Sequence, residues 1–125
     1  MFMTHLECSL TGERYESDRL QNLSKVGKPL LARYDLDAAA ARLTPESLAS
    51  RPAGMWKWRE LLPLPDDAEP VSLGEPETPL IPLDAVGLRQ GVRAPIVKDE
   101  GRLPTGSFKA RGMAAAVSMA KHFGV

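Results

Sequence analysis

The 125-residue chain has a single cysteine, few aromatic residues and no excess of either charge. Cys8 alone cannot form an internal disulfide, and such sparing use of cysteine favours a reducing compartment. The 16 basic and 16 acidic side chains balance, which argues against partners such as nucleic acid or an anionic membrane, because both attract a local excess of positive charge. No apolar run approaches the roughly 20 residues that span a bilayer. The start of the chain lacks the features of a signal peptide, so we expect a cytoplasmic protein.

Proline and glycine, in contrast, are plentiful and unevenly placed. The chain has 11 prolines and 10 glycines, and nine of the prolines lie between Pro45 and Pro95. A hydrophobic core would then have to come from two short flanks, which indicates an incomplete domain. Because small chains bury a smaller fraction of their surface, we expect these 125 residues alone to be marginally stable.

The first part of the chain alternates between apolar and polar residues, as half-buried strands do. Leu6, Cys8 and Leu10 fall on one face of a first strand, which a turn at residues 11–13 sends back. A second alternating run, residues 30–36, follows another turn. We predict two small hairpins and then a short helix within residues 36–43.

In the centre of the chain, residues that begin and end helices predict short elements only. Thr44 before Pro45 combines a hydroxyl N-cap with a proline in the first turn, which predicts a short helix. Residues 54–62 contain both tryptophans and can form two helical turns before Pro63 ends them. Residues 71–95 are rich in turn residues, and we expect only short strands there.

The last part of the chain reads as a strand, a loop and a helix. Residues 94–98 predict the strand, residues 107–122 predict the helix, and Gly124 is a natural C-terminal stop. The helix is rich in alanine, as helices packed closely on a sheet often are, yet we expect no sheet within this chain for it to cover. The order of elements predicts an α/β protein.

The start of this helix contains the residues with the clearest potential for chemistry. Ser107 is a good N-cap, so Lys109 falls in the first helical turn. The positive end of a helix disfavours an ammonium group and suits an anionic cofactor or substrate. A neutral amine there could attack an aldehyde and form a Schiff base. The alternative is an ordinary surface lysine; a P-loop is excluded, because no lysine directly follows Gly106.

Three stretches of the chain together resemble the threonine synthases, which are fold-type II pyridoxal-phosphate enzymes. They are Met-Trp-Lys-Trp-Arg-Glu-Leu-Leu-Pro at residues 55–63, Ser-Leu-Gly-Glu-Pro-Glu-Thr-Pro-Leu at 72–80 and Pro-Thr-Gly-Ser-Phe-Lys-Ala-Arg-Gly at 104–112. Lys-Asp-Glu-Gly at 98–101 leads into the last of these, as a similar stretch does in that family. They occur in the family's order and span nearly the whole chain. The resemblance implies the N-terminal part of an α/β enzyme of the tryptophan synthase β type. A serine/threonine dehydratase and a non-catalytic truncated product remain alternatives.

The resemblance also implies a cofactor, a substrate and residue roles. Lys109 would bind pyridoxal 5′-phosphate as a Schiff base and carry protons at the α and γ carbons of the substrate. The reaction would convert O-phosphohomoserine and water to threonine and phosphate, in an enzyme that is a homodimer when complete. Ser107 is a candidate for cofactor binding, and Thr105 and Arg111 are candidates for substrate binding. Helix capping by Ser107 and a structural ion pair for Arg111 are the alternative interpretations.

The chain departs from the family pattern at a few positions. Leu103 stands where relatives often have asparagine, Pro76 where they have glycine, and Ala110 where many have aspartate. The resemblance places a Ser-Gly-Asn segment, a glycine-rich phosphate loop and a polar partner for the pyridine nitrogen beyond residue 125. We therefore expect this chain to lack the phosphate cradle and to be catalytically inactive by itself.

A zinc ribbon precedes the catalytic domain in some threonine synthases. The matching positions here are Cys8, Thr11, Leu23 and Val26, so only one of the four nitrogen or sulfur ligands that zinc requires is left. We predict a metal-free relic of a ribbon, in which Cys8 is a small buried apolar residue. The predicted order is a ribbon-like hairpin segment at residues 1–43, a helical and proline-rich linker at 44–70, and the start of the catalytic domain at 71–125.

Overall fold

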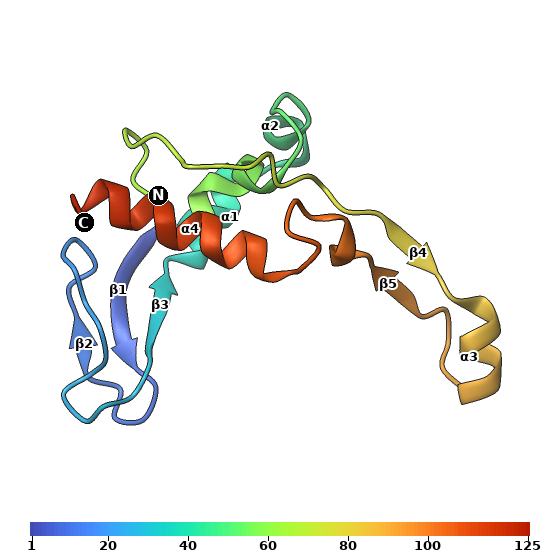
Figure 1. The fold of residues 1–125 in the computed structure, drawn as a ribbon, viewed down its shortest axis with the longest axis horizontal. Helices are drawn as coiled ribbons and strands as arrows, with labels where there is room; N and C mark the ends of the chain where they lie inside the picture. The colour runs from blue at the N-terminus through green and yellow to red at the C-terminus, as the bar shows by residue number, and fades with distance from the viewer.

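The computed structural model describes residues 1–125 and combines a small sheet, a long helix and a projecting arm (Figure 1). The predicted mixture of helices and strands is confirmed, and all of its strand pairs are antiparallel. No helix is both long enough and apolar enough to cross a membrane. The elements in chain order are β1 (Met3–Cys8), β2 (Arg14–Tyr15), β3 (Leu30–Tyr34), α1 (Leu36–Arg42), α2 (Pro45–Ala49), the 3₁₀ helix η1 (Met55–Leu61), β4 (Leu80–Pro82), α3 (Asp84–Gln90), β5 (Ile96–Lys98), the 3₁₀ helix η2 (Glu100–Arg102) and α4 (Lys109–His122).

The N-terminal sheet has the strand order β2-β1-β3, and both neighbours run antiparallel to β1. Leu6 pairs with Tyr15 on one side and with Ala32 on the other. The first predicted hairpin is confirmed, but the prediction of a second, separate hairpin is wrong. β3 pairs with β1 instead, which satisfies the hydrogen-bonding groups that β1 would otherwise leave open along its second edge.

The two short helices after the sheet form where the sequence predicts them, within residues 36–43 and after the Thr44 cap. The Asp35 carboxylate accepts the N–H of Ala38 at 2.9 Å and begins α1. Thr44 and Ser47 form a reciprocal capping box at the start of α2. The tryptophan segment also turns, but as the 3₁₀ helix η1, which is kinked at Trp58.

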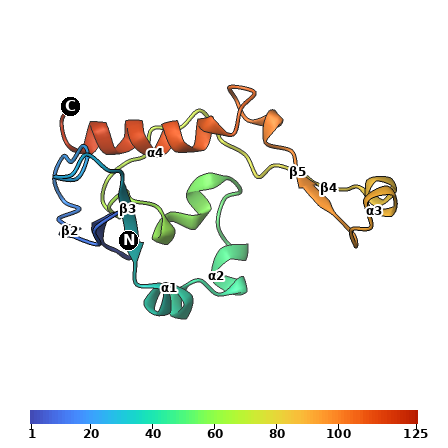
Figure 2. The same ribbon diagram turned by 90° about the horizontal axis from the view of Figure 1, so that it is seen from below.

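A long arm formed by β4, α3 and β5 projects from the rest of the chain (Figures 1 and 2). β4 and β5 are antiparallel, with Ile81 opposite Val97. The strand at β5 was predicted, but α3 corrects the expectation that residues 71–95 contain only turns and short strands. Gly87 lets α3 pack against the chain that returns after it, because a β-carbon there would lie 2.6 Å from the Val92 carbonyl oxygen.

Helix α4 lies across one end of the N-terminal sheet (Figures 1 and 2). Met119 and Ala120 of α4 line one groove together with Leu6 and Ala32 of the sheet. The expectation that the chain contains no sheet near this helix is therefore wrong. The core is small, and its buried apolar side chains are Cys8, Ala39, Met55, Leu64, Leu103, Ala110 and Ala114.

Candidate functional site

The loop before α4 is held in place by its own backbone and by one buried side chain. Leu103 is only 3% exposed, and its carbonyl oxygen accepts the N–H of Gly106 at 2.7 Å. Gly106 has φ +64°, the left-handed region that favours glycine. This turn delivers Thr105 and Ser107 to the start of the helix, where the Ser107 hydroxyl accepts the N–H of Lys109 at 3.3 Å.

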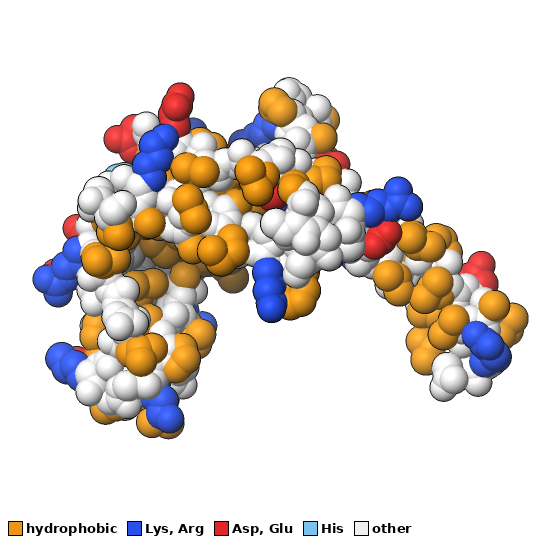
Figure 3. Space-filling model, in the orientation of Figure 1, with side chains coloured by type: hydrophobic (Ala, Val, Ile, Leu, Met, Phe, Trp, Pro, Cys, Tyr) orange, Lys and Arg blue, Asp and Glu red, His pale blue; other side chains and the backbone are white.

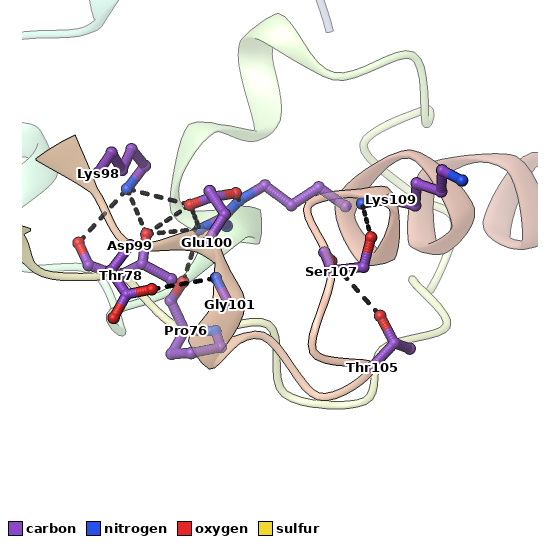
Figure 4. Close-up of polar contacts among 10 residues, drawn as sticks. Pro76, Thr78, Lys98, Asp99, Glu100, Gly101, Thr105, Ser107 and Lys109 are labelled. Atoms are coloured by element: carbon purple, nitrogen blue, oxygen red, sulfur yellow. Dashed lines mark hydrogen bonds and ion pairs between the residues drawn. The ribbon is translucent and has the colours of Figure 1, made fainter.

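Lys109 is the first residue of α4, as the sequence predicts to within one turn. The N-cap residue is Phe108, one position later than the predicted cap Ser107. The Ser107 hydroxyl still accepts a hydrogen bond from the Lys109 N–H. The Lys109 side chain is exposed and points away from Thr78, Lys98 and Glu100 (Figure 4). The arrangement thus presents an amine that is not committed to an ion pair.

Arg111 is engaged in a two-pronged ion pair with Glu100. Its Nε donates to one carboxylate oxygen at 2.7 Å and its Nη2 donates to the other at 2.9 Å. The same Nη2 donates to the Pro76 carbonyl oxygen at 3.0 Å. Arg111, with the Thr78 hydroxyl next, lowers the pKa of Glu100 to about 2. This geometry matches the ion-pair interpretation of Arg111 and leaves its guanidinium largely occupied.

Lys109 and Arg111 face different sides of α4. Residues two apart in an α-helix are rotated by about 200°, so a guanidinium aimed at Glu100 leaves the lysine directed elsewhere. The structure therefore brings together Thr105, Ser107 and Lys109, and it separates Arg111 from them.

Three residues of this region were missed by the sequence analysis as functional candidates. Thr78 is buried, and its hydroxyl donates to Glu100. Lys98 donates to the Thr78 hydroxyl at 2.7 Å and lies 3.4 Å from Glu100. The sequence did contain a signal for these residues, because all three lie in stretches that resemble threonine synthases. Thr78 lies in the stretch that ends in Thr-Pro-Leu, and Lys98 and Glu100 lie in Lys-Asp-Glu-Gly.

The departures from the family pattern have local explanations. Leu103 and Ala110 are 3% and 4% exposed, so both are apolar core residues at the root of the loop and helix. Pro76 is exposed, and the group it contributes is its backbone carbonyl, which Arg111 binds. None of the three contacts the Lys109 amine.

The environment of Cys8 is polar as well as buried. Cys8 is 1% exposed, as predicted, but its thiol donates to the Ser24 hydroxyl at 3.2 Å. Hydrogen bonding to Ser24 and to Thr11 lowers the pKa of the thiol. Leu23 and Val26, at two of the ribbon positions, expose about half of their surface. No group of three or more His, Cys, Asp or Glu side chains is arranged to hold a metal ion.

Lys109 does not line the main clefts of the surface. The largest cleft, about 560 Å³, lies around Met55, with Arg51 and Lys57 in its lining. A smaller groove of about 240 Å³ runs between Leu73 and Met113, and Thr105 borders it. The lysine is exposed and lines neither of these hollows.

Comparison with known proteins identifies relatives of this chain. No family model and no solved structure matches it. The threonine synthase of Methanocaldococcus jannaschii is 36% identical over 118 residues, which are 94% of this chain and 29% of that protein. The threonine synthase of Methanosarcina acetivorans is 36% identical over 124 residues, 98% of this chain and 30% of that protein. The threonine synthase of Halalkalibacterium halodurans is 48% identical over 68 residues, 54% of this chain and 19% of that protein. The resemblance read from the motifs is thus confirmed: the chain is a sequence relative of the threonine synthases and spans less than a third of their length.

Proposed function

We propose that this chain is the lysine-bearing part of a threonine synthase, a lyase that converts O-phosphohomoserine and water to threonine and phosphate. The observation that carries the proposal is the exposed, unpaired Lys109 at the start of α4, within a chain that matches threonine synthases over nearly its whole length. The fold-type II architecture, the pyridoxal-phosphate cofactor and a cytoplasmic location are parts of the same proposal.

The residues of this chain fit one end of pyridoxal 5′-phosphate. Lys109 offers a free amine, and β-carbons added at Gly106 or Gly112 would meet nothing within 4 Å, so the surface around the amine is open. The Thr105 and Ser107 hydroxyls lie in the same turn. When bound, the cofactor supplies an aldehyde for the amine and an electron sink for carbanions. The remaining contacts of the cofactor would come from the part of the relatives' length that this chain does not span.

The roles of the chain's own residues follow from this placement. Lys109 would hold the cofactor covalently and move a proton at the α and γ carbons of the substrate. The Ser107 hydroxyl accepts the N–H of Lys109 and so stabilises the start of the helix, and Thr105 borders the groove between Leu73 and Met113. The polar contacts of Arg111 favour a structural role over the substrate contact that the resemblance implied.

A chimeric enzyme tests the proposal. This chain would replace the stretch of the M. jannaschii threonine synthase that it matches, and the chimera would be supplied with pyridoxal phosphate and O-phosphohomoserine. We expect equal amounts of threonine and phosphate. Lys109→Ala should abolish the reaction, and Lys121→Ala, a change of another exposed α4 lysine, should preserve it.

Two results would count against this function. The first is a folded chimera that forms no threonine, or one that is equally active with Lys109→Ala. The second is release of ammonia from serine or threonine in place of the expected products, which would identify the dehydratase alternative.

We also propose that residues 1–43 are a metal-free relic of a zinc ribbon. The exposed apolar side chains of Leu23 and Val26 at two ligand positions support this reading. The chain purified from zinc-supplemented medium should contain less than about one tenth of a zinc ion per molecule, because four nitrogen or sulfur ligands are needed for a structural site. One equivalent of zinc that survives dialysis would contradict it.

A further inference from the structure

We infer that Glu100 and Arg111, supported by Thr78 and Lys98, form a positioning cluster that sets the direction in which α4 presents Lys109. The inference rests on the proposed function, since it assigns these residues a purpose relative to the lysine. None of the four touches the Lys109 amine, so their role is to position and not to react.

The ion pair between Glu100 and Arg111 fixes the relative orientation of the two side chains as well as the distance between them. Both carboxylate oxygens of Glu100 are bound, one by Nε and one by Nη2 of Arg111. A planar, two-pronged pair of this kind restrains the orientation of both side chains, which a single contact from a lysine cannot do. The further bond from Arg111 to the Pro76 carbonyl ties the same guanidinium to a third segment. The first turn of α4 is thereby connected to η2 and to the chain that enters β4.

The other contacts of this helical turn are few. Lys109 and Phe108 are exposed, and within residues 108–111 only Ala110 is buried. Alanine has a single side-chain carbon and fixes little of the rotation of a helix about its axis. The polar contacts of Arg111 therefore restrain this first turn, whereas the buried Ser118 restrains the helix about two turns further on, through hydrogen bonds to the Val71 backbone of 2.9 and 3.3 Å.

The rest of the cluster holds Glu100 itself in place. The Thr78 hydroxyl is buried and donates to Glu100, and Lys98 reaches both Thr78 and Glu100 (Figure 4). A carboxylate with several donors keeps its charge and its orientation. The cluster also keeps the Arg111 charge away from the lysine side of the helix, so that an anionic ligand at Lys109 does not compete for the guanidinium.

The chain contains a matched control for this pair. Arg51 and Glu60 form a second two-pronged ion pair, with both contacts at 2.7 Å. Both residues precede the arm and lie outside the loop and the helix of Lys109. Glu60→Gln therefore removes an equivalent pair without touching the proposed positioning cluster.

The test measures the reactivity of Lys109 without relying on catalysis. The 125-residue chain is incubated with pyridoxal phosphate, reduced with borohydride and digested, and labelling of Lys109 is divided by labelling of Lys121. We expect a ratio well above one. Glu100→Gln and Arg111→Lys should each lower it by about threefold or more, because misplacement of a reacting group is costly. Glu60→Gln should leave the ratio unchanged.

Amide hydrogen exchange provides the second readout. The N–H groups of residues 113–115 close the first turns of α4, and they should exchange faster in Glu100→Gln but not in Glu60→Gln. Equal ratios in Glu100→Gln and Glu60→Gln would overturn the inference, and so would faster exchange without a change in labelling. If Glu100→Gln fails to fold by circular dichroism, Arg111→Lys, which keeps the charge, gives the answer. A parent ratio near one would also overturn the inference, because Lys109 would then have no distinct reactivity to set. The chimeric enzyme tests the proposed function separately, which separates the two failures.

Discussion

At the scale of single residues, Leu64 shows where this small protein keeps its core. It lies between Pro63 and Pro65, in a stretch that reads as a linker, yet its side chain is 0% exposed and is the largest that the fold buries completely. Prolines on both sides restrict the backbone and so help to fix the direction of the leucine. The proline-rich segment is therefore part of the packed interior.

We predict that Leu64→Ala destabilises the chain by about 2–4 kcal/mol, because a large side chain is lost from a site without solvent. In a protein of marginal stability this approaches the whole free energy of unfolding. Urea unfolding followed by tryptophan fluorescence measures the change. Leu88→Ala is the control, since Leu88 is 87% exposed; equal effects of the two substitutions would contradict the assignment.

Two carboxylates predict how stability depends on pH. The pKa of Glu60 is lowered from 4.5 to about 2 by Arg51, and that of Glu100 is lowered to about 2 by Arg111. A carboxylate with a lowered pKa binds protons more weakly in the folded state, so its stabilisation is complete above the unfolded value and is lost as the pH falls. The melting temperature should therefore decrease from about pH 5 towards pH 2.

The Glu60→Gln variant tests this cause. It should melt at a lower temperature than the parent at pH 7, and the difference should shrink at pH 3, where the parent has lost part of the same contribution. Thermal unfolding by circular dichroism at several pH values gives both numbers. A difference that stays constant across the range would rule out the Arg51 pair as the source.

At the scale of elements, two helical glycines have opposite surroundings. A β-carbon at Gly87 in α3 would lie 2.6 Å from the Val92 carbonyl oxygen and 2.7 Å from a side-chain carbon of Pro95. A β-carbon at Gly112 in α4 would meet nothing within 4 Å. The first glycine permits the close return of the arm, and the second only weakens its helix.

The same substitution at these two sites should have opposite effects. Gly112→Ala should stabilise the chain by about 0.5–1 kcal/mol, since alanine loses less backbone entropy in a helix. Gly87→Ala should destabilise the arm, visible as faster amide exchange in β4 and β5. Stabilisation by both changes would mean that α3 does not pack against Pro95 as described.

At the scale of the whole molecule, the exposed surface is too large for a compact protein. The accessible area is 8529 Å², whereas a compact monomer of 13.6 kDa exposes about 6,600 Å². Only 13 residues are buried. Apolar side chains cover the arm and follow α4 on the face shown in Figure 3. The chain therefore leaves more surface exposed than a compact monomer of its mass does.

We predict that the isolated chain associates with itself as its concentration rises, because exposed apolar surface of this extent drives association. Sedimentation velocity over a range of concentrations measures it. A double variant with Leu88→Lys and Ile96→Lys on the arm should associate less, since both side chains are mostly exposed. A parent chain that stays monomeric throughout would contradict the prediction.

Contacts between residues that are close together in the sequence were determined by the sequence alone. The caps Asp35 and Thr44 begin their helices, Gly106 turns the loop, and Lys109 lies in the first turn of α4. Each of these depends on residues within about four positions, where hydrogen bonding and backbone preference decide the outcome. The resemblance to threonine synthases was likewise present in short stretches of consecutive residues.

Only the tertiary structure decided which distant segments meet. β3 could have formed its own hairpin, but it pairs with β1 because that edge was open. Arg111 could have faced a substrate, but it binds Glu100 and the Pro76 carbonyl because the segments just before and just after the arm lie beside α4. Strand pairing and ion pairs depend on which partner arrives at the right distance and orientation. That outcome is set by the whole chain, and no local pattern specifies it.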